Sequence, residues 1–302
     1  MFAWVADLLW KLECRSNRRL TFRSTHPGTV VFDRRGTDPS SFAQRHGPRD
    51  ARLAVVITTH ARPQPCARLL EQLHASLDEA GQLDSAFVLL FEDRSPVDYG
   101  PVQQLLESFF PGRHAVYVPR TRVGKRGFWQ VHHQAAKAVQ ALGAPHALYL
   151  QDDLELVPGF VRRALAQWSA IQDPRKAVLN LCVMPDDEPE GRWVRHRRQA
   201  LSGGEIRRTQ WFDLPAFLAG PRFFQVIGSE VFPTPPTRWA RDASRSSGVG
   251  EQLTRRLHGR ANVYQLAHTL VLHGDEESVM NPDARATRRM DNRRARSWLP
   301  SP

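Results

Sequence analysis

The stretch LYLQDDLELVPGF, from Leu148 to Phe160, decides the fold and locates a first candidate site. Its apolar run predicts a buried strand that ends in two adjacent carboxylates, Asp152 and Asp153. Pro158 suits the first turn of a helix, so a helix is expected next. Two half-buried carboxylates need a counter-charge, which a divalent cation usually supplies. At the carboxyl end of a strand, where α/β sheets bind ligands, the pair predicts a metal-bound phosphate ligand. The plainer interpretation is a solvated acidic turn.

The segments around this stretch alternate between short apolar runs and helical patterns. Such alternation predicts βαβ units and a mostly parallel sheet. After residue 184 the alternation fails: a charged segment, an aromatic segment broken by prolines and a long loop precede one more helix and an apolar run. The predicted strands are 53–58, 86–91, 114–118, 146–151 and 176–183, and the predicted helices are 63–80, 101–110, 128–142, 159–171 and 250–259.

Composition describes a globular protein with a basic charge. The 302 residues are 41% hydrophobic and carry a net charge of +11. Only four of the 42 basic residues are lysine, and arginine suits phosphate, in nucleic acid, acidic lipid or a nucleotide-sugar diphosphate. Three scattered cysteines and the lack of an apolar run of roughly 18 residues favour a cytoplasmic setting. The predicted parts are 1–50 (an amphipathic helix and linker), 51–281 (the main domain) and 282–302 (a basic, disordered tail).

Several motifs follow one another in a recognisable order: VVITTHARP (55–63), LLFEDRSP (89–96), QDD (151–153), GVGEQLTRRLHG (248–259) and LVLHGDEES (270–278). This ordered set resembles nucleotide-sugar glycosyltransferases of the GT-A fold, with the layout of the inverting family 2. The acidic motif is similar to that of the N-acetylglucosaminyltransferase I type, with Gln151 where glutamate is usual. The resemblance covers residues 52–281. It implies an α/β GT-A fold with a mostly parallel central sheet, flanking helices and a smaller acceptor-side region.

The resemblance also implies a metal-dependent enzyme. It transfers a sugar, hexosyl or N-acetylhexosaminyl, from a nucleotide sugar to a glycan or lipid-linked acceptor with inversion. Asp153 is expected to ligate Mn²⁺ or Mg²⁺, and Asp152 to face the ribose or donor sugar. His273, after the last apolar run, is the expected second ligand, with His268 as its rival. An imidazole among oxygen ligands favours Mn²⁺.

The remaining expected roles concern the nucleotide and the base. Thr58, His60 and Arg62 after the first strand are expected at the nucleotide sugar. Asp93 is expected to accept a hydrogen bond from the nucleobase, which favours uridine, and Lys125 to approach the diphosphate. The expected catalytic base is Glu251 at a helix start, with Asp242 as the alternative, and the expected acceptor wall is Trp211, Phe212 and Asp213.

Other functions remain as alternatives. A nucleotidyltransferase would carry a glycine-rich loop after the first strand, and TTHARPQP contains no glycine. A basic protein that binds nucleic acid without catalysis would fit the charge, but no helix-turn-helix, zinc-finger or RRM signature is found. A membrane-surface role is also open, because the apolar face of residues 2–12 could lie on anionic lipid or pack on the domain.

Overall fold

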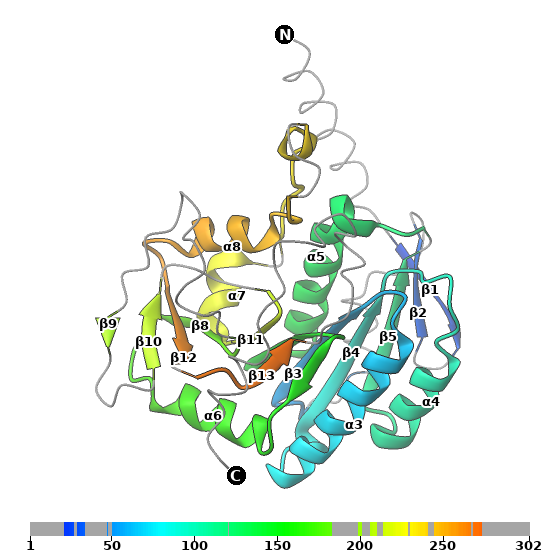
Figure 1. The fold of residues 1–302 in the computed structure, drawn as a ribbon, viewed down its shortest axis with the longest axis horizontal. Coiled ribbons are helices and arrows are strands. Elements are labelled where there is room, and N and C mark those ends of the chain that lie inside the picture. The colour runs from blue at the N-terminus through cyan, green and yellow to red at the C-terminus, as the bar shows by residue number, and fades with distance from the viewer. Residues whose placement is uncertain are drawn as a thin grey trace.

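A computed structural model describes most of the chain between residues 21 and 273 (Figure 1). The predicted amphipathic helix of residues 2–12 and the basic tail lie outside the described residues. So do most of the charged segment after residue 184 and the predicted acceptor wall of 211–213. The described ranges are 21–26, 29–33, 47, 50–119, 121–182, 199–200, 206–209, 214–228, 230–240, 245–266 and 268–273.

Four parallel strands form the centre of the sheet, in the order β5-β4-β3-β6. Their apolar, β-branched sequences suit strands that are covered on both faces. β3 and β4 are buried along their whole length. The register places Thr58 opposite Phe91 on one side and Gln151 on the other, so the carboxyl ends of β3, β4 and β6 meet at one edge. These strands are β3 (Leu53–Thr59), β4 (Ala86–Glu92), β5 (His114–Pro119) and β6 (His146–Gln151).

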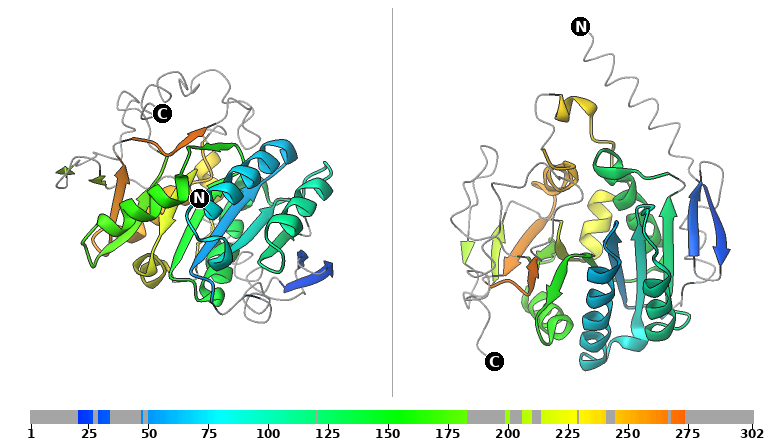
Figure 2. Two further views of the ribbon diagram at one scale, coloured as in Figure 1. Left: turned by 90° about the horizontal axis from the view of Figure 1, so that it is seen from below. Right: turned by 45° about the vertical axis from the view of Figure 1, so that its right-hand side comes forward.

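Helices cover both faces of the sheet and form one apolar cluster on each side (Figure 2). Side chains of α3, α4 and α6 build one cluster, and those of α5, α7 and α8 build the other. The predicted α/β fold with a parallel centre and flanking helices is therefore confirmed. The helices are α3 (Pro63–Glu79), α4 (Gly100–Phe109), α5 (Gly124–Leu142), α6 (Phe160–Ala170), α7 (Pro221–Ile227) and α8 (Val249–Leu257).

The sheet continues beyond β6 through an antiparallel strand that the sequence analysis did not predict. β11 (Ala216–Ala219) lies between β6 and β8 (Lys176–Asn180) and pairs antiparallel with both. It is only four residues long, and it lies in an aromatic segment that prolines interrupt, so its sequence carries no clear strand pattern. The order then continues β8-β12-β10-β9, with β12 (Asn262–Leu266) parallel to β8. β10 is Ile206–Thr209, and β9 is Gln199–Ala200.

Three smaller features complete the part of the fold that the structure describes. β1 (Thr21–His26) and β2 (Thr29–Asp33) form a hairpin, and β2 pairs with β5, so the sheet extends beyond the expected start of the main domain at residue 51. β7 (Leu154–Leu156) and β13 (Val271–His273) form a separate two-stranded sheet. Two short 3₁₀ helices are η1 (Leu83–Ser85) and η2 (Pro236–Trp239).

Candidate active site

The loops that follow β3 and β4 bond to each other and shape the edge where the predicted site residues gather. Ala61 and Arg94 have φ angles of 56° and 41°, a region that non-glycine residues rarely adopt. The His60 ring Nδ1 lies 2.8 Å from the carbonyl oxygen of Asp93, and the Ala61 N–H donates to Ser95 Oγ at 3.1 Å. Strained backbone of this kind persists where the surroundings hold it, often at functional sites.

The acid pair at the end of β6 is bridged by a single guanidinium group. Arg62 Nη2 lies 2.7 Å from Asp152 Oδ1, and Arg62 Nη1 lies 2.6 Å from Asp153 Oδ2. The arginine side chain is 15% exposed, and those of the two aspartates are 1% and 5% exposed. The counter-charge that the pair requires is thus supplied here by an arginine of the chain itself, which the sequence analysis had expected at the nucleobase or the phosphates.

Asp152 is almost fully enclosed, and donors surround its carboxylate. Oδ2 accepts hydrogen bonds from Thr59 Oγ1 at 2.7 Å and from the His60 N–H at 3.3 Å, while Oδ1 faces Arg62. Burial raises the pKa of Asp152 to about 7, although Arg62 and the Thr59 hydroxyl act in the opposite direction. Its hydrogen bonds tie β6 to the loop after β3.

The donor chemistry at this edge fits a hard divalent cation at Asp153 rather than at Asp152. Such ions accept one or two carboxylates and complete their shell with water and substrate phosphates. Both Asp152 oxygens are engaged by Thr59, the His60 N–H and Arg62, so Asp152 is not a candidate ligand. No group of three or more His, Cys, Asp or Glu side chains within the described ranges could hold a metal ion. A cation would therefore rely on Asp153 and on the substrate.

The backbone of His273 lies next to this position, and its side chain is outside the described residues. β13 pairs antiparallel with β7 so that His273 opposes Leu154, the residue directly after Asp153. Its rival His268 is an exposed residue between β12 and β13.

Asp93 is buried at the end of β4 and holds the first turn of α5. Its Oδ1 accepts from the Val123 N–H at 2.7 Å, and its Oδ2 accepts from the Gly124 N–H at 2.8 Å. Burial raises the pKa of Asp93, and these two N–H groups act against that rise. A nucleobase would have to share the Asp93 oxygens with these two backbone N–H groups. Lys125, which follows Gly124, is half-buried at the same end of α5.

Glu251 lies in the first turn of α8 and is held by two arginines. Arg238 Nη1 is 2.7 Å from its Oε2, and Arg255 Nη2 is 2.5 Å from its Oε1. Each oxygen of the predicted base thus bonds to an arginine, and an acceptor hydroxyl would share one of these oxygens with an arginine or displace it. The alternative base, Asp242, lies outside the described residues.

Several residues of this edge escaped the sequence analysis. The side chain that reaches Asp152 belongs to Thr59, whereas its neighbour Thr58 contributes its carbonyl oxygen, which accepts from the Asp152 N–H at 3.1 Å. The Tyr99 hydroxyl lies 2.6 Å from Thr59 Oγ1. Glu92 is buried, and burial raises its pKa to about 7. The alternation of side chains along a strand could have pointed to Thr59, but no sequence signal identified Tyr99 or Glu92.

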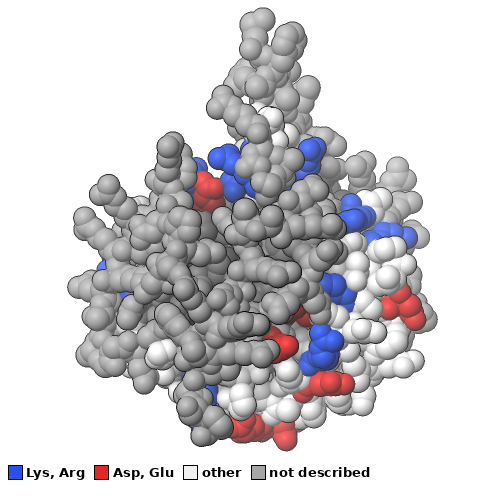
Figure 3. All heavy atoms as spheres, viewed as in Figure 1, with Lys and Arg blue, Asp and Glu red and all other residues white. Residues whose placement is uncertain are grey.

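Charges are mixed on the described surface that faces the viewer in Figure 3. On the side of Figure 3 where α3 and α4 lie, basic and acidic side chains alternate among uncharged ones, and the described atoms there show no large patch of one sign. Among the helices within the described ranges, none combines the length and the apolar character that a membrane span requires.

Comparison with known proteins identifies the fold. No protein-family model and no curated protein sequence matches the chain. Residues 1–349 of TarS from S. aureus match over 74% of this chain and 60% of that one, at 14% identity and a TM-score of 0.51. GalNAc-T7, solved with UDP, GalNAc and Mn²⁺, matches 71% of this chain at 16% identity and a TM-score of 0.48.

The mannosyltransferase PcManGT from Pyrobaculum calidifontis, solved with GDP-Man and Mn²⁺, matches 75% of this chain at 17% identity and a TM-score of 0.40. The matches span 41% of GalNAc-T7 and 55% of PcManGT, so each of the three proteins extends well beyond the shared part. The likeness to TarS has a TM-score above 0.5, and it shows that the fold is that of a GT-A glycosyltransferase.

Proposed function

We propose that the chain is a metal-dependent glycosyltransferase that moves a sugar from a nucleotide sugar, preferably a UDP-sugar, to a glycan or lipid-linked acceptor. One observation carries the proposal: in a GT-A fold, a buried pair of carboxylates lies at the carboxyl end of β6, beside the ends of β3 and β4. Ligands of open α/β sheets bind at this edge. A pair of acids there suits a substrate that brings phosphates and a cation.

Asp153 is the residue that would hold the ion, with His273 as the second candidate because β13 brings its backbone opposite Leu154. Mn²⁺ or Mg²⁺, when bound, would offset the negative charge that gathers on a departing diphosphate. Arg62 would then be free of Asp153 and could contact the phosphates, for which a planar guanidinium is well shaped. Asp152 stays in place and fixes the loop after β3.

The nucleotide is proposed to lie across the ends of β3 and β4. Asp93 offers its remaining lone pairs to the nucleobase, and Thr58 and His60 border the same space. Burial lowers the pKa of His60, which keeps its ring neutral beside the arginines of this region. Lys125, in the first turn of α5, is assigned to the diphosphate.

Glu251 is proposed as the base that takes the proton of the acceptor hydroxyl while its oxygen bonds to the sugar carbon and the diphosphate leaves from the opposite face, a single displacement that inverts that carbon. A base has to reach the proton that it removes, within hydrogen-bond distance. Because both Glu251 oxygens bond to arginines, the acceptor hydroxyl would share an oxygen with an arginine or take the place of the exposed Arg255.

The test uses a panel of UDP- and GDP-sugars with Mn²⁺ and measures donor binding and slow donor hydrolysis. Asp153→Asn should lose hydrolysis, while Asp78→Asn, an exposed acid on α3, should behave as wild type. Glu251→Gln should keep donor binding and lose transfer to an acceptor. The proposal is overturned if no nucleotide sugar binds, or if the two aspartate variants behave alike.

A cytoplasmic setting, with contact to the inner face of the membrane, is part of the same proposal. It rests on the three scattered cysteines of the sequence and on the arginine-rich segments near its two ends. Co-sedimentation with anionic liposomes, with and without residues 1–20, tests the membrane contact. Equal binding by both forms would remove the N-terminal segment from this role.

A further inference from the structure

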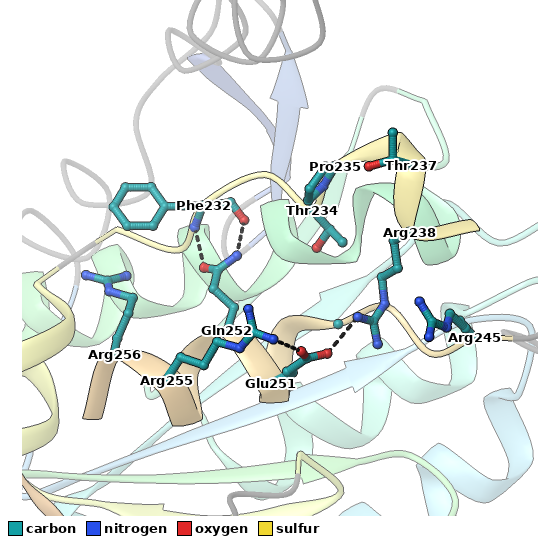
Figure 4. Close-up of a pocket in the computed structure, with 11 residues that line it drawn as sticks. Phe232, Thr234, Pro235, Thr237, Arg238, Arg245, Glu251, Gln252, Arg255 and Arg256 are labelled. Atoms are coloured by element: carbon teal, nitrogen blue, oxygen red, sulfur yellow. Dashed lines mark hydrogen bonds and ion pairs between the residues drawn. The ribbon is translucent and has the colours of Figure 1, made fainter. Parts of the chain in front are cut away.

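A cavity lies between the loop before α8 and α8 itself, with a volume of about 490 Å³ (Figure 4). Its lining carries four arginines and a single acid, so its formal charge is 4 − 1 = +3. We call it the arginine pocket. Its charged residues are Arg238, Arg245, Arg255, Arg256 and Glu251.

Two of the arginines are anchored by the backbone. Arg238 donates from Nε to the Ser246 carbonyl at 2.9 Å, and it runs so close to Gly248 that an added Cβ there would lie 2.8 Å from Arg238 Nε. Arg256 donates to the Ile227 carbonyl at 2.5 Å and to that of Glu230. These arginines are therefore fixed parts of the pocket wall.

The other two arginines are able to reach a ligand. Arg255 is 69% exposed and bonds to Glu251, the one acid of the pocket. Arg245 is exposed, and its side chain has no hydrogen bond or ion pair to a residue within the described ranges. Two anchored and two adaptable guanidinium groups around one carboxylate leave positive charge that an oxyanion can neutralise, and guanidinium groups bind phosphate with paired hydrogen bonds.

The rest of the lining suits a sugar ring. Phe232 is 38% exposed, and its ring lies 4.5 Å from the Arg256 guanidinium carbon. Thr234 and Thr237 add hydroxyl groups to the same wall. An aromatic face, hydroxyls and arginines together match a phosphorylated sugar better than a bare anion.

The pocket adjoins the candidate active site through α5. Arg126 of α5 lies over the Trp239 ring at 5.9 Å, and Trp239 follows Arg238 of the pocket. The start of the same helix is held by Asp93 at the end of β4. The first turn of α5 therefore links the pocket to Asp93 of the proposed donor site, and neither aspartate of the acid pair lines the pocket.

We propose that the arginine pocket binds a phosphate ester carried by the acceptor, so that the acceptor is a phosphorylated glycan rather than a neutral one. This inference rests on the proposed function. A phosphate that draws the exposed Arg255 to itself releases Glu251 Oε1 from that ion pair. An acceptor that lacks the phosphate leaves Arg255 on Glu251, so it fits the pocket poorly and reacts slowly.

The experiment is calorimetric titration at low salt, with inorganic phosphate, a hexose phosphate and the uncharged hexose as probes. Phosphate and hexose phosphate should bind wild type, the hexose should not, and Arg245→Ala/Arg255→Ala should weaken binding about tenfold or more. Arg162→Ala is the matched control, because Arg162 is also an exposed helical arginine paired to one glutamate, Glu79, at 2.8 Å. The control should bind phosphate as wild type does.

A competition with UDP separates the acceptor phosphate from the donor diphosphate. Phosphate binding that persists under saturating UDP supports the inference, whereas displacement by UDP assigns the pocket to the donor and overturns it. Equal phosphate affinity in wild type and the double variant, or equal loss in Arg162→Ala, also overturns it. If the double variant loses phosphate binding but no nucleotide sugar binds wild type, the proposed function fails while the anion site remains.

Discussion

Replacing Arg62 by glutamine removes the counter-charge of the acid pair and leaves its neighbours in place. In the structure one guanidinium bridges Asp152 and Asp153 at 2.7 and 2.6 Å, and both carboxylates are nearly closed to solvent. The variant therefore confines two negative charges at the end of β6 without a cation. Glutamine keeps part of the side-chain volume, so the change reports mainly on charge.

Removing one partner of a buried ion pair costs about 3 to 5 kcal/mol. Because the Arg62 side chain is 15% exposed, we expect the lower end, about 3 kcal/mol, for the unfolding free energy at pH 8. The loss should shrink towards pH 5. Burial already raises the pKa of Asp152 to about 7, and losing Arg62 raises it further, so the folded variant binds more protons than the unfolded chain above pH 4. Its stability then falls as the pH rises.

Urea unfolding followed by tryptophan fluorescence measures these differences, at pH 5 and pH 8, with and without Mn²⁺. Mn²⁺ should stabilise Arg62→Gln more than wild type, because in wild type the cation and Arg62 compete for Asp153. Arg62→Gln/Asp153→Asn should regain most of the lost stability. Arg162→Gln, which breaks the exposed pair with Glu79, should cost no more than about 0.5 kcal/mol.

Two results would refute this reasoning. If Arg62→Gln stays within about 0.5 kcal/mol of wild type at pH 8, the acid pair is solvated and needs no buried counter-charge. If Mn²⁺ stabilises Arg62→Gln and wild type equally, the metal and Arg62 do not share Asp153.

Three further predictions concern stability. Burial lowers the pKa of His132 to about 4, so wild type should lose about 3 kcal/mol as the pH falls from 6.5 to 4, and His132→Leu should show a shallower loss in acid unfolding curves. Gly220→Ala puts a Cβ 2.3 Å from Trp168 Cζ2 and should cost about 1 to 3 kcal/mol in urea; an unchanged midpoint would contradict that contact. Thr59→Val removes the hydroxyl donor to Asp152 and should cost about 1 to 3 kcal/mol, measured in the same way.

The central strands and the acid pair were predictable because their signals are local. β3 and β4 are short apolar runs rich in β-branched or aromatic residues, and Asp152 and Asp153 follow a run of the same kind. The helices between them show regular apolar spacing. These parts of the fold follow from neighbours within a few residues in the chain.

The parts that escaped prediction depend on contacts between distant segments. β11 is a four-residue strand, and only its pairing with β6 and β8 distinguishes it from a loop. The bridge from Arg62 to the acid pair depends on the turn at Ala61. Its positive φ could not be predicted, because alanine rarely adopts such an angle. The arginines on Glu251 come from the short helix η2, within a segment whose sequence has no periodicity, and from the next turn of α8. The sequence therefore did not predict that both oxygens of Glu251 bond to arginines.

The position of β11 also affects how the protein unfolds. Its Leu218 pairs with Leu148 of β6 on one side and with Leu179 of β8 on the other, so a single strand joins the parallel centre to the rest of the sheet. Neither half can melt without opening ladder hydrogen bonds of β11, and its amides should be among the last to exchange with deuterium. The two halves should therefore unfold in one cooperative transition. A substitution that destabilises one half should also lower the stability of the other.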